Sequence, residues 1–205
     1  MNHYLAEARA NLSAYDLECL ARYRYKVFVD HLGWPLPLAS RDKEVEWDEF
    51  DNEDTLYIIA RDAEGRVCGC ARLLPTTKPH LLSTVFPVLA LRNPRTEPDV
   101  WELSRFATCQ IVDDRAQPAS PDSMRCLLTE VMRLCQKLEA RLLVGVAPYG
   151  MFRLYRKLGY DLRPDGIPHT IDGEAICAFS LSVTSDLPTA PSRTSEPTRV
   201  GLAAA

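Results

Sequence analysis

Residues 121–160 read PDSMRCLLTEVMRLCQKLEARLLVGVAPYGMFRLYRKLGY, and this stretch decides the fold class. Its first half predicts a helix over 121–140, because apolar side chains recur there at helical spacing: Leu127, Leu128, Val131, Leu134, Cys135 and Leu138. The apolar run over 142–147 then predicts a buried strand, and a second helix is expected over 149–158. With a further strand at about 174–183, this order predicts an α/β sandwich with a mixed sheet.

The first half of the chain predicts a helix, a hairpin and one more strand. Ser13 is a helix-capping residue, and a helix is expected over 13–29. Strands are expected at 55–61 and 67–74, joined across the turn residues AEG, and another at 100–109.

Residues 184–205 differ in composition from the rest of the chain. They read TSDLPTAPSRTSEPTRVGLAAA, with ten Pro, Ser or Thr among 22 residues and no aromatic side chain. Such a segment cannot bury enough apolar surface to offset the entropy of ordering it. We therefore expect a single domain over 1–183, followed by a flexible tail.

The composition argues against nucleic-acid and membrane binding. Of the 205 residues, 46% are hydrophobic, and 24 basic against 28 acidic residues give a net charge of −4. Neutralising phosphates needs an excess of clustered Lys and Arg, which is absent. No apolar run approaches the roughly 18 residues of a membrane span, and the N-terminus MNHYLAEARANL lacks the features of a signal peptide. A cytoplasmic protein is expected.

Cysteine and histidine usage argues against a metal site. The seven cysteines are an odd number without a CxxC pair, and most lie in apolar segments, so reduced thiols in the core are expected. The four histidines are far apart, and none has the helical spacing of metal ligands.

Three arginines occur where apolar side chains are expected. Arg24 shares the inward face of the first helix with apolar residues, and Arg72 and Arg105 lie in the apolar segments CARLLPT and WELSRF. A guanidinium there costs several kcal/mol unless an acid pairs with it. Each arginine can be a snorkelling or structural side chain, or the three can share one polar cleft with a ligand. Glu102 and Arg105 would point to opposite faces of an alternating strand unless a β-bulge intervenes.

Acids are available in and around EWDEFD at 46–51: Glu44, Glu46, Asp48, Glu49, Asp51, Glu53 and Asp54. Such runs are usually solvated loops, and this one does not have the spacing of an EF-hand. Beside Phe28, Trp34 and Trp47, however, these carboxylates would suit a cationic ligand, because aromatic faces and acids both attract positive charge.

Glycine usage excludes several nucleotide-binding motifs. Neither GxGxxG nor GxxxxGK[ST] occurs, which argues against a Rossmann or P-loop enzyme. The segment CQIVDDRAQPASPDS before the 121–140 helix is also free of glycine, so the loop that would cradle the pyrophosphate of coenzyme A is missing. The 149–158 helix carries a basic face that is either solvated or fits an acidic partner; it consists of Arg153, Arg156 and Lys157.

Five ordered motifs resemble a known family: RYRYKVF followed by LGW, EWDEFD, ARLLPTT, TVFP and WELSRFA. Over about residues 4–183 the chain resembles the acyl-homoserine-lactone synthases, the autoinducer synthases of bacterial quorum sensing. The family's invariant positions fall on Arg24, Phe28, Trp34, Asp48, Asp51, Arg72, Phe86, Glu102 and Arg105.

The resemblance implies a three-layer α-β-α sandwich like that of N-acetyltransferases, with a mixed, mostly antiparallel sheet. It also implies a reaction without cofactors, in which an acyl carrier protein (ACP) gives its fatty acyl group to the amine of S-adenosylmethionine (SAM). Lactone closure then releases methylthioadenosine (MTA). ACP is acidic and would dock on the basic face of the 149–158 helix. The enzyme is expected to be a monomer or weak dimer.

The resemblance also suggests roles for single residues. SAM binding falls to Arg24, Phe28, Trp34, Arg105 and Phe106, with Arg24 or Arg105 available for the SAM carboxylate. Catalysis falls to Glu102, Arg105, Arg72, Asp48 and Asp51. In this hypothesis Glu102 accepts a proton from the amine, directly or through water, and backbone donors near Leu103 and Phe106 stabilise the oxyanion. Asp48, Asp51, Arg24 and Arg105 would form one ion-pair network.

The acyl chain is expected between the sheet and the 121–140 helix, among Phe86, Leu103, Met124, Leu128, Val144, Val146 and Ala147. In the family, a Thr near the position of Ala147 tends to accompany 3-oxo chains, so an unsubstituted chain of about eight carbons is favoured here. The alternatives are an acyl-CoA-dependent N-acyltransferase of the same fold and a non-catalytic ligand-binding module.

Overall fold

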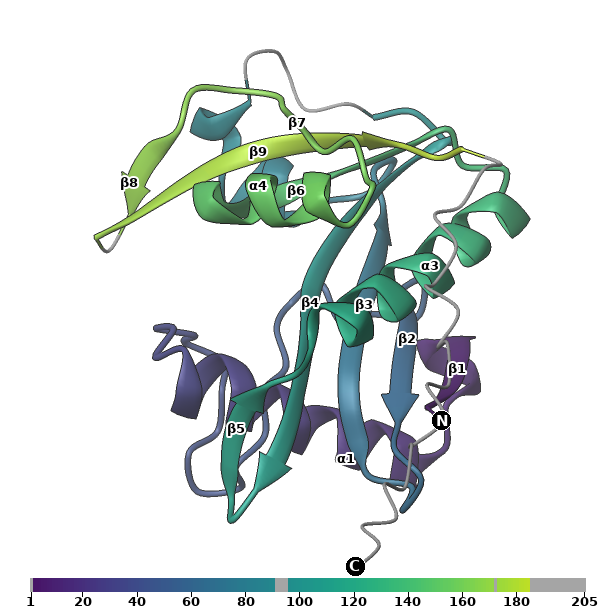
Figure 1. The fold of residues 1–205 in the computed structure, drawn as a ribbon, viewed down its shortest axis with the longest axis vertical. Helices are drawn as coiled ribbons and strands as arrows, with labels where there is room; N and C mark the ends of the chain where they lie inside the picture. The colour runs from purple at the N-terminus through teal and green to yellow at the C-terminus, as the bar shows by residue number, and fades with distance from the viewer. Residues whose placement is uncertain (1, 91–95, 172, 185–205) are drawn as a thin grey trace, which may run out of the picture.

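The computed structural model describes residues 2–90, 96–171 and 173–184 (Figure 1). The strands are β1 His3–Ala8, β2 Leu56–Arg61, β3 Val67–Pro75, β4 Val100–Val112, β5 Arg115–Pro118, β6 Leu142–Pro148, β7 Arg163–Pro164, β8 His169–Ile171 and β9 Glu174–Ser182. The helices are α1 Ala14–Arg24, α2 Leu81–Thr84, α3 Pro121–Lys137 and α4 Tyr149–Lys157, with the short turns η1 Arg9–Asn11, η2 Tyr25–His31 and η3 Pro87–Leu89.

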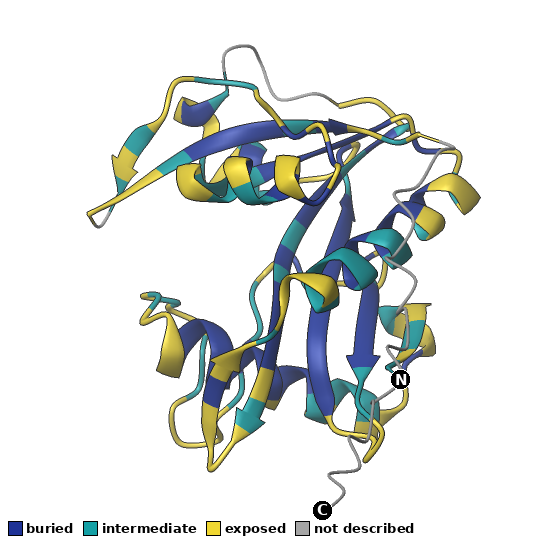
Figure 2. Ribbon diagram, viewed as in Figure 1, coloured by how far each residue is buried: buried dark blue, intermediate teal, exposed yellow. Residues whose placement is uncertain are grey.

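The strands of the described residues form one sheet in the order β1-β2-β3-β4-β6-β9-β7, with β5 paired to β4 and β8 to β9. Among the described strands, only β4 and β6 run parallel, and every other pair is antiparallel. Helices α3 and α4 pack on one face, and α1, η2 and α2 on the other (Figure 1). Buried residues follow the sheet between the helices (Figure 2). The predicted three-layer sandwich with a mixed, mostly antiparallel sheet is confirmed.

The elements predicted from the sequence begin within one residue of their observed starts. The strand expected at 100–109 continues to Val112, because a hairpin with β5 holds its end through register pairs from Cys109 to Val112. The strand β1 was not predicted. Its sequence HYLAEA is rich in helix-forming residues, and antiparallel pairing with β2 outweighs that propensity. The predicted tail lies outside the described residues, apart from Thr184.

The first helix changes pitch after Arg24. Ser13 caps α1 as predicted, since its Oγ accepts a hydrogen bond from the Asp16 N–H at 3.1 Å. From Tyr25 the helix continues as the π-helical η2, a form often found at functional sites. The Trp34 N–H then bonds the Phe28 carbonyl at 2.9 Å, which turns the chain back over the helix.

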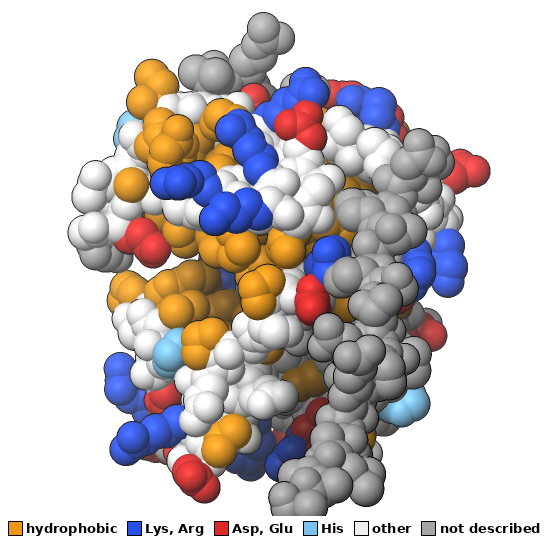
Figure 3. All heavy atoms as spheres, in the orientation of Figure 1, with side chains coloured by type: hydrophobic (Ala, Val, Ile, Leu, Met, Phe, Trp, Pro, Cys, Tyr) orange, Lys and Arg blue, Asp and Glu red, His pale blue; other side chains and the backbone are white. Residues whose placement is uncertain are grey.

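The sheet divides between β4 and β6. The two strands pair only from Val100 to Glu102 against Leu142 to Val144. Beyond that point β4 has no strand partner on this edge among the described residues until β5 joins at Cys109. Hydrophobic side chains gather in the hollow between the two halves of the molecule (Figure 3). This edge leaves part of the β4 backbone available to a ligand.

Two further observations concern membrane-spanning helices and metal-binding clusters. No helix in the described ranges has the length and apolar character needed to cross a bilayer. Within the same ranges, His, Cys, Asp and Glu side chains do not gather into a group of three that would hold a metal ion. All seven cysteines are free thiols, and five of them are buried.

Candidate active site

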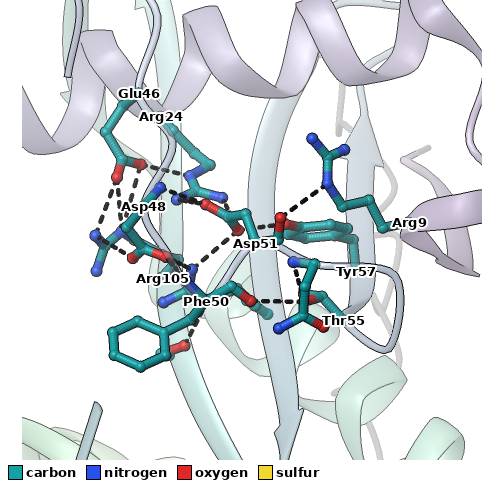
Figure 4. A network of polar contacts seen from close by, with 12 residues as sticks. Arg9, Arg24, Glu46, Asp48, Phe50, Asp51, Thr55, Tyr57 and Arg105 are labelled. Atoms are coloured by element: carbon teal, nitrogen blue, oxygen red, sulfur yellow. Dashed lines mark hydrogen bonds and ion pairs between the residues drawn. The ribbon is translucent and has the colours of Figure 1, made fainter. Parts of the chain in front are cut away.

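Three arginines and three carboxylates meet on the α1 face of the sheet, and Figure 4 labels five of them: Arg24, Arg105, Glu46, Asp48 and Asp51. The guanidinium groups come from α1, β3 and β4, and the carboxylates from the loop before β2: Arg24, Arg72, Arg105, Glu46, Asp48 and Asp51. Their formal charges sum to zero. A burial of six charges is tolerable only because each one has partners of opposite sign.

Arg24 is a fully buried cation of the network, at 0% exposure. Its Nε donates to Glu46 Oε2 at 2.5 Å, and Nη1 and Nη2 donate to the two oxygens of Asp51 at 2.8 and 3.0 Å. Each of its three nitrogens therefore already donates to a carboxylate. Asp51 also accepts hydrogen bonds from the Tyr57 hydroxyl and from the Asp48 N–H.

Arg72 and Arg105 complete the network from the sheet. Arg72 Nη1 donates to Asp48 Oδ1 at 2.6 Å and to Asp51 Oδ1 at 2.9 Å. Arg105 Nη2 donates to Asp48 Oδ2 at 2.8 Å and to Glu46 Oε1 at 3.0 Å. The expected ion-pair network of Asp48, Asp51, Arg24 and Arg105 is thus observed, enlarged by Arg72 and Glu46.

A β-bulge in β4 turns Arg105 towards the network. Arg72 pairs with Ser104 and Cys70 with Ala107, so two β4 residues, Arg105 and Phe106, oppose a single residue of β3. Arg105 adopts φ 47°, the left-handed region that a bulge uses. Ser104 and Arg105 consequently bond groups on the same face of the sheet. In a strictly alternating strand these two neighbours would point to opposite faces.

The network keeps its carboxylates ionised. Burial acts to raise the pKa of Asp51, but the charges of Arg24 and Arg72 outweigh it and lower the pKa well below the usual range. Burial likewise opposes ionisation of Glu46, and Arg24 and Arg105 again prevail, so the pKa of Glu46 is lowered. Both acids are therefore anionic at neutral pH.

An aromatic pair lies beside the network. The rings of Phe28 and Trp34 stack with centroids 5.0 Å apart at 23°. The Arg105 guanidinium lies 5.5 Å from the Phe28 centroid and 6.0 Å from that of Trp34. These rings and Arg105 form one wall, as expected for a site that receives a ligand with both apolar and charged parts.

Glu102 lies three residues before Arg105 and outside the ion-pair network. Its Oε2 accepts the Leu81 N–H at 2.8 Å and its Oε1 accepts the Leu82 N–H at 2.7 Å. The side chain is buried, and burial raises the pKa of Glu102 despite these two bonds. Arg72 contacts the same strand as this acid, since its Nε donates to Ser104 Oγ at 2.9 Å. Its buried Nη2 has no partner among the described residues.

The family model described as autoinducer synthase matches residues 9–187 of the chain. The chain belongs to the autoinducer synthase family. An acyl-homoserine-lactone synthase from Ralstonia nicotianae is 46% identical over 167 residues, 80% of this chain and 80% of that protein. The chain is thus an acyltransferase that makes acyl-homoserine lactones, and the non-catalytic alternative is set aside.

Solved structures agree with this assignment. TofI, in a ternary complex with an inhibitor and MTA, has a TM-score of 0.79 and 37% identity over 90% of this chain and 94% of that chain. The CoA-dependent synthase BjaI, with SAM and isopentyl-CoA, has a TM-score of 0.78 and 28% identity, covering 90% and 85%. A putative N-acetyltransferase from Lactobacillus plantarum shares only the fold, at a TM-score of 0.58, 18% identity and 89% and 99% coverage.

Not every predicted residue of this autoinducer synthase lies where it was expected. Phe106 was assigned to the SAM site, but its side chain lies on the α3 face with its ring 6.1 Å from that of Tyr155. The bulge is the reason, because it moves Phe106 to the face opposite Arg105. Phe106 can contribute to the network side only through its backbone.

The acyl-pocket prediction divides between two faces of the sheet. Residues on the α3 face as expected are Leu103, Met124, Leu128 and Ala147. Residues on the α2 face, where the prediction is wrong, are Phe86, Val144 and Val146. Alternation along β6 puts Val144 and Val146 on the face opposite Ala147, since successive side chains of a strand point to opposite faces, and Phe86 lies between α2 and η3.

The predicted docking residues Arg153, Arg156 and Lys157 are exposed on α4. Basic side chains gather over this helix in the space-filling view (Figure 3). The helix buries Phe152 and Tyr155 on its other face. The autoinducer synthase therefore presents the basic face that the sequence predicts.

The sequence reasoning assigned no role to Glu46, Ser104, Tyr57 or His80. Glu46 bonds both Arg24 and Arg105, and only its place in the EWDEFD motif signalled it. The acid-rich segment before this motif also gains a role, because Glu44 contacts Lys26 Nζ at 3.4 Å. Ser104, Tyr57 and His80 have no distinguishing sequence pattern.

A cavity of about 720 Å³ lies outside the network, between α1 and the segment 41–47. Trp47 forms part of its lining and separates it from Arg24, whose guanidinium lies 4.9 Å from the Trp47 ring centroid. The lining contains neither Glu102 nor Arg105. We therefore place the candidate active site of this autoinducer synthase on the network side.

Proposed function

We propose that the enzyme transfers a fatty acyl group from ACP to the amine of SAM and closes the lactone with release of MTA. The observation that carries this proposal is the neutral ion-pair network, which holds Arg105 beside the Phe28–Trp34 pair and Arg72 against Ser104, two residues after the buried Glu102. SAM is a sulfonium cation with a carboxylate and an ammonium group. The aromatic rings suit the sulfonium, the arginines suit the carboxylate, and Glu102 suits the ammonium group.

Arg72 and Arg105 are the arginines best placed to bind the carboxylate of SAM. Each nitrogen of Arg24 already donates to Glu46 or Asp51, which makes Arg24 a positioning residue rather than a direct ligand. Arg72 Nη2, in contrast, is a buried donor without a partner. Leaving such a group unsatisfied costs about 1–3 kcal/mol, and a carboxylate would remove that cost.

Glu102 is the proposed base for the amine. An α-ammonium is largely protonated at neutral pH and must lose a proton before it can attack a thioester. Burial raises the pKa of Glu102 and so makes it a better proton acceptor. Backbone N–H groups along the open edge of β4, near Leu103 and Phe106, would stabilise the oxyanion. The SAM carboxylate then attacks Cγ, which closes the lactone and releases MTA.

The acyl donor is proposed to be ACP on the evidence of two features. The segment before α3 lacks glycine, and the basic face of α4 fits an acidic protein. BjaI shows that a family member can be CoA-dependent, so acyl-CoA is the alternative that the experiment must separate. An unsubstituted acyl chain of about eight carbons remains the proposal, because Ala147 cannot bond a 3-oxo group.

The test follows MTA release and lactone mass with octanoyl-ACP and octanoyl-CoA, each mixed with SAM. We expect turnover with octanoyl-ACP, and a loss of about 100-fold or more in kcat for Glu102→Gln. The exposed Glu49→Gln is the matched control and retains wild-type turnover. Near-wild-type kcat for Glu102→Gln would refute the base assignment, and a dominant 3-oxo product from a bacterial host would refute the chain assignment.

Docking is tested by charge reversal on α4. The double variant Arg153→Glu, Arg156→Glu should lower kcat/KM for octanoyl-ACP about tenfold at low salt, with less effect at high salt. Lys137→Glu, an exposed charge reversal at the end of α3, is the control and should leave kcat/KM near the wild-type value. Preference for octanoyl-CoA together with an indifferent α4 variant would replace ACP by acyl-CoA.

A further inference from the structure

Lys26 contacts acids from three parts of the chain. It lies in η2, two residues before Phe28, and is buried at 9% exposure. Its Nζ donates to Asp114 Oδ2 at 2.8 Å, in the turn between β4 and β5, and to Glu44 Oε1 at 3.4 Å, in the segment before EWDEFD. A third acid, Asp30, lies four residues further along η2, at 3.2 Å. The hydrogen bond to Asp114 raises the pKa of Lys26, so this ammonium stays charged.

The segments that meet at this ammonium are those that build the SAM side of the candidate site. Glu44 precedes Glu46 by two residues, so its contact holds the start of the carboxylate segment against η2. Asp114 lies at the tip of the hairpin that β5 forms with β4, the strand of Arg105, and this hairpin packs against η2. η2 itself carries Phe28. One cation therefore joins the supports of the carboxylates, the arginine and the aromatic wall.

The backbone of both bridging acids shows that their side chains are required. Glu44 adopts φ 51° and Asp114 adopts φ 61°, in the left-handed region that is uncommon for residues other than glycine. Such a conformation persists where the surrounding structure needs that particular residue, and it points to a function. The two carboxylates supply the need here, because both accept a hydrogen bond from Lys26.

We infer that Lys26 is a positioning residue for SAM binding, which holds the carboxylate segment and the β4–β5 hairpin against η2 before SAM arrives. The inference rests on the proposed function, because it takes SAM as the ligand of this side. Without Lys26, SAM would have to order these segments as it binds, which costs affinity. Once SAM is bound the segments are in place, so kcat should depend little on Lys26.

The sign of the charge effect separates positioning from a simple electric field. SAM carries a sulfonium, an ammonium and a carboxylate, and is therefore a net cation. Lys26→Met removes a positive charge, which by the field alone would favour a cationic ligand. Weaker SAM binding by this variant would thus report lost positioning. Removing an acid weakens binding of a cation through the field as well, so each acid variant needs a control with the same change of charge.

The experiment measures the Kd for SAM by calorimetry without an acyl donor, and then KM and kcat with the acyl donor that wild type uses. The matched controls are exposed acids that do not contact Lys26: Asp113→Asn for Asp114→Asn, and Asp42→Asn for Glu44→Gln. Asp113 belongs to the same turn as Asp114 and also has positive φ, at 47°. Thermal unfolding checks that every variant is folded.

For Lys26→Met we expect Kd and KM for SAM to rise about fivefold, because its half-exposed ion pairs each contribute modestly. The value of kcat should stay within about twofold of wild type. Lys26→Arg keeps the cation and should recover most of the lost affinity. Glu44→Gln and Asp114→Asn should each raise Kd about two- to threefold, with a much smaller effect in the Lys26→Met background. Both controls should bind SAM like wild type.

Three outcomes would overturn the inference. One is unchanged or tighter SAM binding by a folded Lys26→Met enzyme, the latter being the result of the field alone. Another is a loss confined to kcat. The third is an Asp113→Asn enzyme that loses as much affinity as Asp114→Asn, since Lys26 would then not be the reason. Failure of wild type to bind SAM would instead refute the proposed function, which is a distinguishable result.

Discussion

Glu46→Gln is expected to destabilise the enzyme strongly, although it removes only one charge. Glu46 is 0% exposed and accepts hydrogen bonds from Arg24 Nε at 2.5 Å and from Arg105 Nη2 at 3.0 Å. Without its charge, the network keeps three guanidiniums against two carboxylates, and one buried positive charge is left without compensation. Breaking a buried pair in this way costs about 3–5 kcal/mol.

Urea and thermal unfolding measure this cost directly. For a chain of this size, Tm shifts by about 2–4 °C per kcal/mol, so Glu46→Gln should lower Tm by about 6–20 °C. Glu49→Gln makes the same chemical change on an exposed side chain three residues further on, and should stay within about 0.5 kcal/mol of wild type. If Glu46→Gln behaved like Glu49→Gln, the network would not contribute to stability as argued.

The pH dependence of the difference in unfolding free energy between wild type and Glu46→Gln is a second check. The pKa of Glu46 is lowered in the folded enzyme, so the stability due to its charge is present above the unfolded pKa of about 4.3 and is lost as pH falls through the folded pKa. The gap in unfolding free energy between wild type and Glu46→Gln should therefore narrow below about pH 4.3. A gap that stayed constant down to acid unfolding would contradict the assigned charge.

Three further predictions concern single contacts. Gly145→Ala should cost about 1–3 kcal/mol in urea unfolding, because the new methyl would lie 2.5 Å from a backbone carbonyl, whereas Gly150→Ala has open space and should not destabilise. Tyr57→Phe removes a hydrogen bond that helps to lower the pKa of Asp51, so acid unfolding followed by circular dichroism should begin at higher pH. Lys26→Met should cost at most about 1 kcal/mol, and less at high salt, because the acids that pair with it are exposed.

The buried arginines were predictable from the sequence because a guanidinium among apolar residues breaks a simple pattern. Arg24 lies on the inward stripe at helical spacing, and its need for acidic partners follows from the cost of burying a charge. The nearest dense supply of acids is EWDEFD, which does provide Glu46, Asp48 and Asp51. Local pattern and elementary electrostatics were sufficient for this part of the site.

The parts that escaped prediction depend on long-range register. Whether Arg105 or Phe106 faces the network is decided by one extra residue in β4, and a bulge leaves no clear trace in composition. The partner of Glu102 is the start of α2, a helix too short for a periodic signal. The same holds for Val144, whose face depends on how β6 aligns with β4.

The zero net charge of the network constrains how the enzyme can bind SAM. A balanced cluster offers little field of its own to attract a zwitterion such as SAM, so binding must come from single groups at its edge that lack a partner. Arg72 Nη2 is such a group, because it is buried without a partner among the described residues while Nε of the same guanidinium bonds Ser104 and Nη1 bonds the carboxylates. The six paired charges then serve to hold Arg72 and Arg105 rigidly, which is how pre-organised sites avoid the cost of ordering side chains when the ligand arrives.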